Sequence, residues 1–215
     1  MTNIFDQFAE KYDRWFDSPE GGAIFRAELA CLRLLRHEPA GRWLEVGVGT
    51  GRFAATLGIA EGVDPPPMLD FAARRGIQTC RGTAEVLPYS DESFDGVLLV
   101  TTLSFVEDPA TAIEECARVL RPGGTLLAGI IPAESPWGRE YARNASEGHP
   151  VYSHARFLSV QQLREFATAA ALCLQESAST LFWPPGSPPS EAPSTEAGVL
   201  AGAGFVALRF VTLQV

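Results

Sequence analysis

Three closely spaced glycines are the residues of this chain with the clearest chemical potential. They lie in the segment Leu44-Glu45-Val46-Gly47-Val48-Gly49-Thr50-Gly51, where an apolar run leads into a helical pattern. Glycine admits positive φ angles and lets a ligand approach the backbone without a Cβ in the way. The helix that follows offers free N–H groups and a positive dipole end. The segment therefore predicts a nucleotide-like ligand, although a Gly-rich turn without a ligand has the same pattern.

The spacing of these glycines distinguishes between classes of nucleotide site. A dinucleotide fingerprint requires G-x-G-x-x-G, whereas position 52 is Arg, and no P-loop motif is present. An acid, Asp64, follows the next apolar run in Gly62-Val63-Asp64-Pro65. A carboxylate there can accept hydrogen bonds from both hydroxyls of a ribose, because two parallel O–H donors match its two oxygens. NAD enzymes use the same device, so Asp64 indicates a ribose rather than a whole cofactor.

The elements that must position these residues alternate along the chain from residue 42. We expect strands at residues 43–46, 59–63, 77–80, 97–100 and 125–131, and helices at 51–57, 67–75 and 109–120. This alternation predicts an α/β fold with a mostly parallel sheet and right-handed crossovers. The run at 97–100 is uninterrupted, as expected for a central strand covered on both faces.

The two ends of the chain follow other patterns. A helix is expected from Ile4 to Phe16, broken by Ser18-Pro19-Glu20-Gly21-Gly22 before a second helix at 23–36. Helices at 135–146 and from a capping box at Ser159 precede two final strands, at 172–182 and 205–213. We interpret the whole as one domain over residues 1–215, in three parts: N-terminal capping helices at 1–38, a cofactor-binding core at 42–131, and substrate-side helices with the last two strands at 132–215.

Composition restricts the partners and the compartment. The 215 residues carry 17 Lys+Arg against 26 Asp+Glu, a formal net charge of −9. Nucleic acids and anionic membranes require a basic surface, so neither is expected as a partner. Residues 1–10 lack the pattern of a signal peptide, and no apolar run is long enough to span a membrane. We therefore expect a cytoplasmic protein.

The four cysteines, Cys31, Cys80, Cys116 and Cys173, show no spacing typical of metal ligands. Each lies in an apolar stretch and is expected to be a small buried hydrophobic residue. The alternative is a set of thiols gathered in space around a soft metal, and no metal site is predicted.

Five ordered segments resemble the class I S-adenosylmethionine (SAM)-dependent methyltransferases, specifically the small-molecule group often called type 11. They are Leu44–Gly51, Gly62–Pro65, Gly82-Thr83-Ala84-Glu85-Val86-Leu87-Pro88-Tyr89, Asp91–Val100 and Arg118-Val119-Leu120-Arg121-Pro122-Gly123-Gly124. The resemblance implies a Rossmann-like, seven-stranded and mostly parallel sheet, with helices on both faces and an antiparallel last strand. It also implies SAM as the cofactor and S-adenosylhomocysteine (SAH) as its product.

The resemblance assigns the first cofactor contacts to the strand ends. It implies that Gly47 and Gly49, with Val48 between them, line the methionine and ribose part of SAM. Glu45 would orient the loop and the amino group, and Asp64 would hold the ribose.

The adenine end follows from the next motifs. By the same resemblance Pro65 and Met68 would contact the adenine, with Ala84 and Glu85 at its polar edge. Thr101 would lie beside the methionine.

Tyr12 resembles the residue that closes the family's pocket, and the alternative is an aromatic that packs its helix onto the sheet. The crossover from Gly47 to Ile59 is near the minimum for a parallel connection, so its helix must be very short.

Candidate acceptor residues follow the fifth strand. His149 or His154 could serve as a base, and Tyr12 is the third catalytic candidate. Arg139 or Arg156 could bind an anionic group.

The alternative for both histidines is a solvated surface position, and Tyr141 and Tyr152 have the same ambiguity. His37 is expected to interact with the dipole at the end of its helix.

The predicted function is methyl transfer from SAM to a small-molecule acceptor. No Asn/Asp-Pro-Pro-Tyr motif follows the fourth strand, where the sequence is Thr101-Thr102-Leu103-Ser104-Phe105, and this disfavours methylation of DNA base amines. A SAM-binding regulator or partner subunit without catalysis is the first alternative. An NAD-dependent oxidoreductase is the second. The residues leave the acceptor, the atom methylated and the oligomeric state open.

Overall fold

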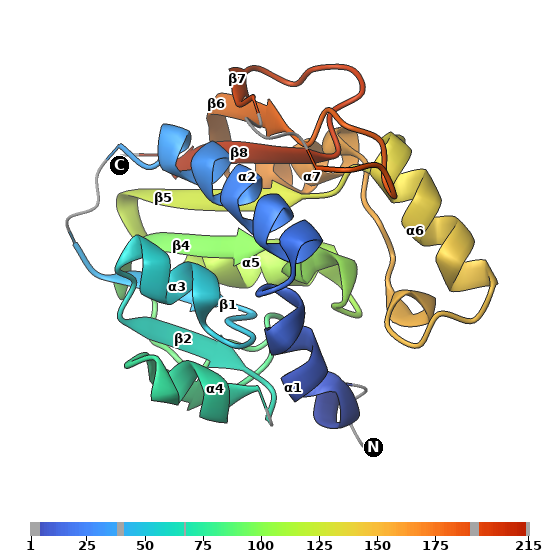
Figure 1. The fold of residues 1–215 in the computed structure, drawn as a ribbon. Helices are drawn as coiled ribbons and strands as arrows, with labels where there is room; N and C mark the ends of the chain where they lie inside the picture. The colour runs from blue at the N-terminus through green and yellow to red at the C-terminus, as the bar shows by residue number, and fades with distance from the viewer. Residues whose placement is uncertain (1–4, 38–40, 67, 190–193, 214–215) are drawn as a thin grey trace.

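Eight strands, counted over the residues that the structure describes, form one sheet in the order β3-β2-β1-β4-β5-β8-β6-β7. The computed structural model describes residues 5–37, 41–66, 68–189 and 194–213 (Figure 1). The strands are β1 (Trp43–Val46), β2 (Glu61–Asp64), β3 (Gln78–Arg81), β4 (Phe94–Val100), β5 (Leu120–Ile130), β6 (Leu172–Thr180), β7 (Glu196–Ala197) and β8 (Phe205–Thr212).

The strand directions confirm the predicted Rossmann-like α/β fold. Strands β1 to β5 pair in parallel, and β8 runs antiparallel to both β5 and β6. The predicted number of seven strands was too low. The additional strand, β7, has two residues, which pair with Ala178 and Ser179 of β6. Two residues in a polar connector are too few to show the alternation that predicts a strand.

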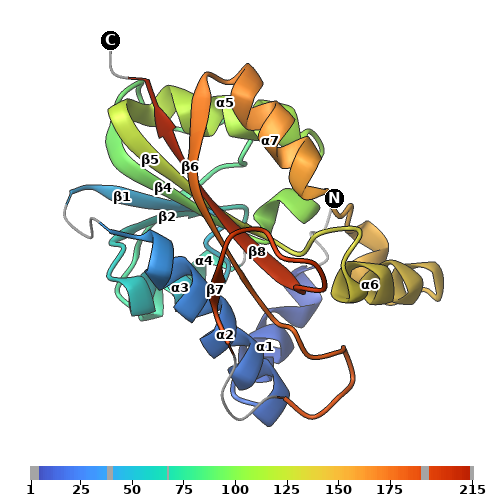
Figure 2. The ribbon, with the colours of Figure 1, turned by 90° about the horizontal axis from the view of Figure 1, so that it is seen from above.

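Helices cover both faces of the sheet (Figure 2). They are α1 (Phe5–Trp15), α2 (Pro19–Leu35), α3 (Arg52–Leu57), α4 (Leu69–Arg74), α5 (Pro109–Val119), α6 (Pro136–Ser146) and α7 (Val160–Ala169), with short 3-10 turns η1 (Thr102–Ser104) and η2 (Tyr152–His154). The apolar run of β4 is uninterrupted because alternate residues of a strand face opposite sides of the sheet, and both sides are covered here. Val97 and Leu99 join the core under α5 and α7, whereas Leu98 and Val100 join the core under α2, α3 and α4.

The start of α2 differs from the prediction. The segment at 18–22 follows the end of α1, as predicted, but it also begins α2, four residues before the expected start: Ser18 is the N-cap, its Oγ accepts the Gly21 N–H at 3.0 Å, and Pro19 occupies the first turn. A Cβ added at Gly21 would overlap the carbonyl oxygen of Trp15. Glycine at this position therefore allows α2 to begin directly against the end of α1.

Most other predicted boundaries agree within a few residues. The third strand lies one residue later than expected, and the helix predicted at 67–75 is shortened to α4. The capping box of α7 is confirmed, because Ser159 Oγ accepts the Gln162 N–H at 3.1 Å and Gln162 Oε1 accepts the Ser159 N–H at 2.9 Å. Ile4, the predicted start of the first helix, lies outside the described residues.

The four cysteines differ in their exposure to solvent. Cys31 and Cys116 are buried as predicted, Cys80 is partly exposed, and the prediction was wrong for Cys173, which is exposed. Side chains alternate along β6, so Cys173 points away from the core that its neighbour Leu172 enters. In the described part of the chain no three His, Cys, Asp or Glu side chains gather as a metal site.

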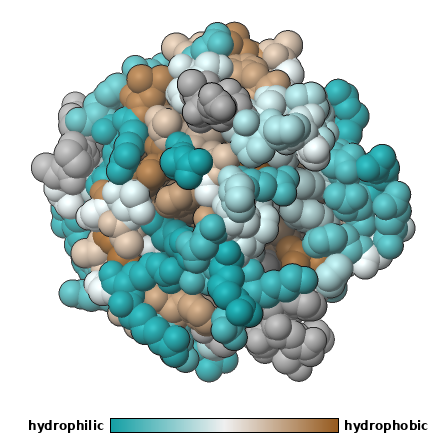
Figure 3. All heavy atoms as spheres, in the orientation of Figure 1, coloured by the Kyte–Doolittle hydropathy of each residue, from teal (hydrophilic) through white to brown (hydrophobic). Residues whose placement is uncertain are grey.

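His37 and the molecular surface were the remaining subjects of prediction. His37 follows the end of α2, and its Nε2 lies 2.6 Å from Glu176 Oε2 of β6, a side-chain partner that was not predicted. Among the described residues no helix is both long and apolar enough to cross a membrane. On the face drawn in Figure 3, apolar areas are small and separated by polar side chains.

The junction between α1 and α2 gives a stability prediction. Substitution Gly→Ala inside a helix usually stabilises it by about 1 kcal/mol. Gly21→Ala is expected to do the opposite, lowering the free energy of unfolding by about 1–3 kcal/mol, because the added methyl overlaps the Trp15 backbone. Urea denaturation measures this, with Glu20→Ala at the neighbouring exposed position as a control. A gain in stability for Gly21→Ala would contradict the packing.

Candidate functional site

A cavity of about 870 Å³ lies at the carboxyl ends of the parallel strands. It is lined by residues that follow four of them: Gly47 and Gly49 after β1, Asp64 at the end of β2, Thr101 after β4 and Ile131 after β5. Open α/β sheets bind ligands at this edge, where neighbouring loops diverge. Helix α1 contributes further lining residues from the other side of the cavity.

The glycine loop after β1 is shaped by backbone hydrogen bonds to β2. The N–H groups of Gly47 and Val48 both donate to the Val63 carbonyl, at 2.8 and 3.1 Å. Gly47 and Gly49 have φ values of +71° and +52°, which side-chain-bearing residues rarely adopt. A Cβ on Gly49 would meet open space. The loop thus presents bare backbone to the cavity, as the sequence predicted.

Asp64 joins the end of β2 to this loop. Its Oδ2 accepts the Gly49 N–H at 2.7 Å, and the carboxylate lines the cavity. Burial raises the pKa of Asp64 to about 6, and the Gly49 hydrogen bond partly offsets that rise.

Nine of the eleven residues proposed for cofactor contact line this single cavity: Tyr12, Gly47, Gly49, Asp64, Pro65, Met68, Ala84, Glu85 and Thr101. The other two, Glu45 and Val48, lie behind the loop. Val48 is buried against Gly62 of β2, so its side chain supports the loop.

Glu45 has an unusual environment for an acid. It is 2% exposed and accepts a hydrogen bond from the Ala54 N–H, and burial raises its pKa well above the ordinary value. Its Oε2 atom has no hydrogen-bond partner among the described residues. Buried carboxylate oxygens are normally paired, so this oxygen has unused capacity beside the glycine loop.

An ion-pair network that sequence reasoning missed fastens α1 to the loop. Arg52 Nε lies 2.9 Å from Asp13 Oδ1, and its Nη1 lies 2.9 Å from Asp17 Oδ1. Arg75 lies 2.9 Å from the other oxygen of Asp13 and donates to the Thr50 carbonyl at 2.9 Å. Burial by itself would raise the pKa of Asp13, but the hydrogen bonds from Arg52 and Arg75 lower it to about 2.

This network explains why position 52 is Arg. In the sequence, Arg52 served only to exclude a dinucleotide fingerprint. In the structure, its ion pairs give it a structural role. By pairing with Asp13, Arg52 holds α1 so that Tyr12 and Trp15 line the cavity. The available signal was an unpaired cation directly after a glycine loop, together with an acid adjacent to Tyr12.

Aromatic rings form the opposite half of the cavity. Tyr141 of α6 stacks on Tyr152 with ring centroids 4.2 Å apart, and His149 stacks on the same Tyr152 at 4.5 Å. His149 Nδ1 accepts the N–H groups of Val151 and Tyr152, both at 3.3 Å.

The remaining acceptor-side candidates divide between this wall and the surface. Tyr12, His149, Tyr141 and Tyr152 all line the cavity. His154, Arg139 and Arg156 are exposed and do not line it.

Glu28 is a second residue that sequence reasoning missed. It lies on the buried side of α2, one turn after Ile24, and both residues line the cavity. Burial raises the pKa of Glu28 to about 8. The signal was an acid at helical spacing between Ile24 and Leu32, on a face otherwise expected to be apolar.

Trp137 of α6 anchors the aromatic half to the last strands. Its Nε1 donates to the Trp183 carbonyl at 2.8 Å, and a Cβ on Gly204 would overlap its indole ring. The connector between β6 and β8 therefore supports the helix that carries Tyr141.

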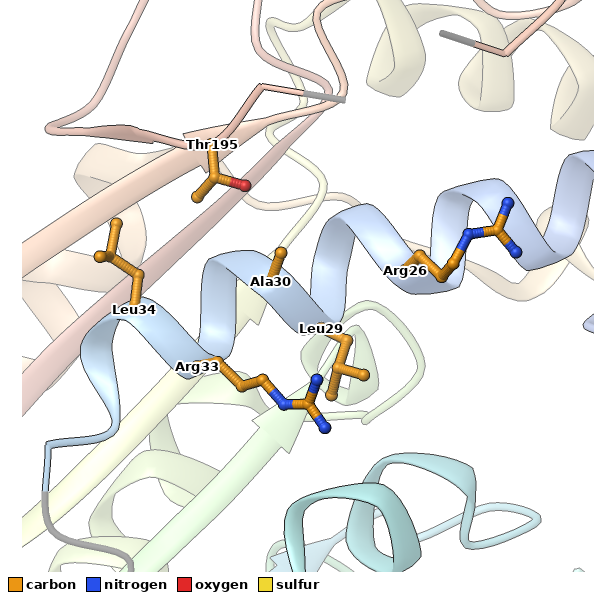
Figure 4. Close-up of a pocket in the computed structure, with 6 residues that line it drawn as sticks. All are labelled: Arg26, Leu29, Ala30, Arg33, Leu34 and Thr195. Carbon is orange, nitrogen blue, oxygen red and sulfur yellow. The ribbon is translucent and has the colours of Figure 1, made fainter. Parts of the chain in front are cut away.

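A second hollow, of about 590 Å³, lies on the outer side of α2 (Figure 4). It is lined by Arg26, Leu29, Ala30, Arg33, Leu34 and Thr195. None of the predicted site residues reaches it, and it is remote from the strand ends, so we do not assign the site there.

The Arg52 network gives a prediction about the cavity. Arg52→Ala is expected to weaken the binding of SAH, the product that the sequence resemblance implies, at least severalfold, because α1 loses its attachment to the loop and the partly buried Asp13 loses a partner. Calorimetry measures the affinity, and hydrogen exchange should show faster exchange in α1. Arg143→Ala, which removes an exposed pair on α6, serves as a matched control and should change neither. If Arg52→Ala binds SAH as tightly as the wild-type protein and α1 exchanges its amide hydrogens no faster, the role of the network is disproved.

Comparison with known proteins agrees with this geometry. A family model described as a methyltransferase domain matches residues 44–128. An uncharacterized protein of Mycobacterium tuberculosis is 40% identical over 204 residues, which are 94% of this chain and 72% of that protein. An uncharacterized protein of Methanocaldococcus jannaschii is 40% identical over 181 residues, 84% of this chain and 86% of its own.

Solved structures extend the similarity over the full chain. A crystal structure from Thermotoga maritima, described as a SAM-dependent methyltransferase, possible histamine N-methyltransferase, matches with a TM-score of 0.89 and 39% identity, over 99% of this chain and 100% of that one. The N-methyltransferase NodS of Bradyrhizobium japonicum, in complex with SAH, matches with a TM-score of 0.62 and 20% identity, over 93% of this chain and 90% of that one, and shows the fold alone. The strand-end cavity, the matched domain and the near-complete match together show that this chain belongs to the SAM-dependent methyltransferases.

Proposed function

We propose that this chain binds SAM in the strand-end cavity and transfers its methyl group to a small-molecule acceptor held in the aromatic half. The observation that carries the proposal is the continuity of the cavity. One space of about 870 Å³ joins the glycine loop and Asp64 to the wall formed by Tyr141 and Tyr152. Its volume is in the upper part of the range usual for small-molecule sites, which supports room for two ligands.

The residues at the glycine loop fit the cofactor. Gly49 leaves open space where a side chain would intrude, and Asp64 presents a carboxylate to the cavity for the ribose hydroxyls. Glu45 lies behind the loop, where its buried side chain accepts the Ala54 N–H and would hold the loop in position for the cofactor. Met68, 3% exposed, offers an apolar surface to the adenine.

When bound, SAM supplies an electrophilic methyl group on a positively charged sulfur, so the chain needs no strong catalytic group. Its residues have to align the acceptor, and such alignment can contribute about 7–11 kcal/mol. Helix α1 would cover the cavity and exclude water through Tyr12 and Trp15. Of the predicted catalytic candidates, Tyr12 and His149 line the cavity and would contact an acceptor there, whereas His154 does not line it.

Calorimetric titration with SAM, SAH and NAD tests the binding step. Saturable binding of SAM and SAH without NAD is the expected result. Binding of NAD alone would contradict the proposal. Turnover of SAM to SAH with a suitable acceptor would then separate an enzyme from a SAM-binding regulator.

Asp64 gives a sharper prediction. Asp64→Asn is expected to reduce SAM affinity about 10- to 100-fold, the range for losing hydrogen bonds to a charged group, while the protein stays folded. Asp70→Asn, at an exposed carboxylate on α4, is the matched control and should bind SAM normally. Unchanged affinity in Asp64→Asn would contradict the ribose assignment.

The raised pKa of Asp64 also predicts a pH dependence. Since its pKa is about 6 in the folded protein, the carboxylate that accepts the ribose hydroxyls is lost as pH falls below 6. SAM affinity should therefore fall from pH 7 to pH 5, and Asp64→Asn should flatten this dependence. Without ligand the sign is opposite: burial favours the protonated acid, so this residue's contribution to stability is present near pH 4 and is lost as pH rises through 6.

A further inference from the structure

Glu28 lacks the partners that a buried acid normally has. It is 5% exposed, and in the described part of the chain no group forms a hydrogen bond or ion pair with it. Leaving a carboxylate in such a place costs free energy unless something compensates its charge. Because Glu28 lines the cavity, the compensating group can be a ligand that enters there.

The surroundings of Glu28 favour a cation. Tyr12, Tyr141 and Tyr152 lie close enough for its charge to raise the pKa of each phenol, in addition to the larger effect of burial. The same rings line the cavity, and Tyr141 and Tyr152 stack face to face. Aromatic faces attract cations through their negative π surface, and this attraction grows when water is excluded.

Most of the charged side chains that line the cavity are acidic. Among the described residues its lining includes the acids Glu28, Asp64, Glu85, Glu107 and Asp108, against Lys11 as the permanent cation. Lys11 is exposed to solvent. Arg139 and Arg156, the predicted partners of an anionic group, do not line the cavity. An anionic acceptor would therefore meet repulsion, whereas an ammonium group would meet attraction.

We propose that the methyl acceptor is a small amine, which Glu28 binds in its ammonium form beside the tyrosine rings that line the cavity. This rests on the methyl transfer proposed above. Glu28 is the specificity-determining group, because an alcohol or a carboxylic acid of the same shape leaves the buried carboxylate uncompensated.

The reaction then balances without a further reactant. The bound ammonium loses one proton to Glu28, whose raised pKa makes it a suitable acceptor. The freed nitrogen lone pair forms a bond to the methyl carbon as the carbon–sulfur bond breaks. The electron pair of that bond stays on the sulfur as the neutral thioether of SAH. The methylated nitrogen carries the positive charge, and Glu28 returns its proton to solvent.

The test measures amine binding to protein saturated with SAH. Butylamine, cyclohexylamine and 2-phenylethylamine are titrated by calorimetry beside 1-butanol, cyclohexanol and 2-phenylethanol. At least one amine is expected to bind saturably and about tenfold or more tightly than its alcohol, the lower range for a charge-assisted contact. Mass spectrometry of a SAM reaction should then show that amine with one added methyl group.

Glu28→Gln tests the residue. It is expected to lose the amine preference while SAH affinity changes less than twofold, and Glu114→Gln, at an exposed acid of α5, should behave as wild type. Glu28→Gln removes a buried charge without changing shape, so it should fold at least as stably at pH 8 and above. If the variant does not fold, the comparison of amines with alcohols on the wild-type protein still tests whether the acceptor is an amine.

Three results would overturn the proposal. They are alcohols binding as tightly as amines, SAH binding without binding of any amine, and loss of SAH affinity in Glu28→Gln, which would assign Glu28 to the cofactor. Failure of SAH to bind wild-type protein is a different outcome, because it would overturn the proposed methyl transfer itself.

Discussion

The turn that leaves β1 is the constraint on which the rest of the site depends. Gly47 and Val48 donate to one carbonyl of β2, and Gly49 donates to Asp64 at the end of the same strand. These three hydrogen bonds tie the loop to the neighbouring strand rather than to its own helix. As a result α3, only six residues long, can remain short without loosening the backbone that faces the cavity.

The two halves of the cavity are held in place by different kinds of interaction. The half that we propose for the cofactor is formed by backbone and strand ends, whose positions follow from sheet geometry. The other half is formed by side chains of α1, α2, α6 and η2, which reach the cavity through ion pairs, ring stacking and a buried acid. Such contacts join residues far apart in the sequence, and each depends on several elements being placed first.

This difference explains what could be predicted. The alternation of strands and helices, the glycine loop and Asp64 follow from local patterns, because each is set by neighbours in sequence. Arg52 with Asp13, and Glu28 with the tyrosine rings, could not be read in the same way, since their meaning lies in partners 39 residues apart or on another helix. The start of α2 was missed for a related reason: Gly21 and Gly22 look like a break unless the Trp15 backbone beside them is known.

The attachment of Trp137 to the connector between β6 and β8 has an evolutionary consequence. The helix that carries Tyr141 is held by Trp183 and Gly204, which belong to segments remote from the glycine loop. Changes in the length or composition of that connector can thus reshape the acceptor half while the cofactor half stays intact. In this fold a surface connector therefore supports the wall that we propose for the acceptor, independently of the hydrogen bonds that shape the glycine loop.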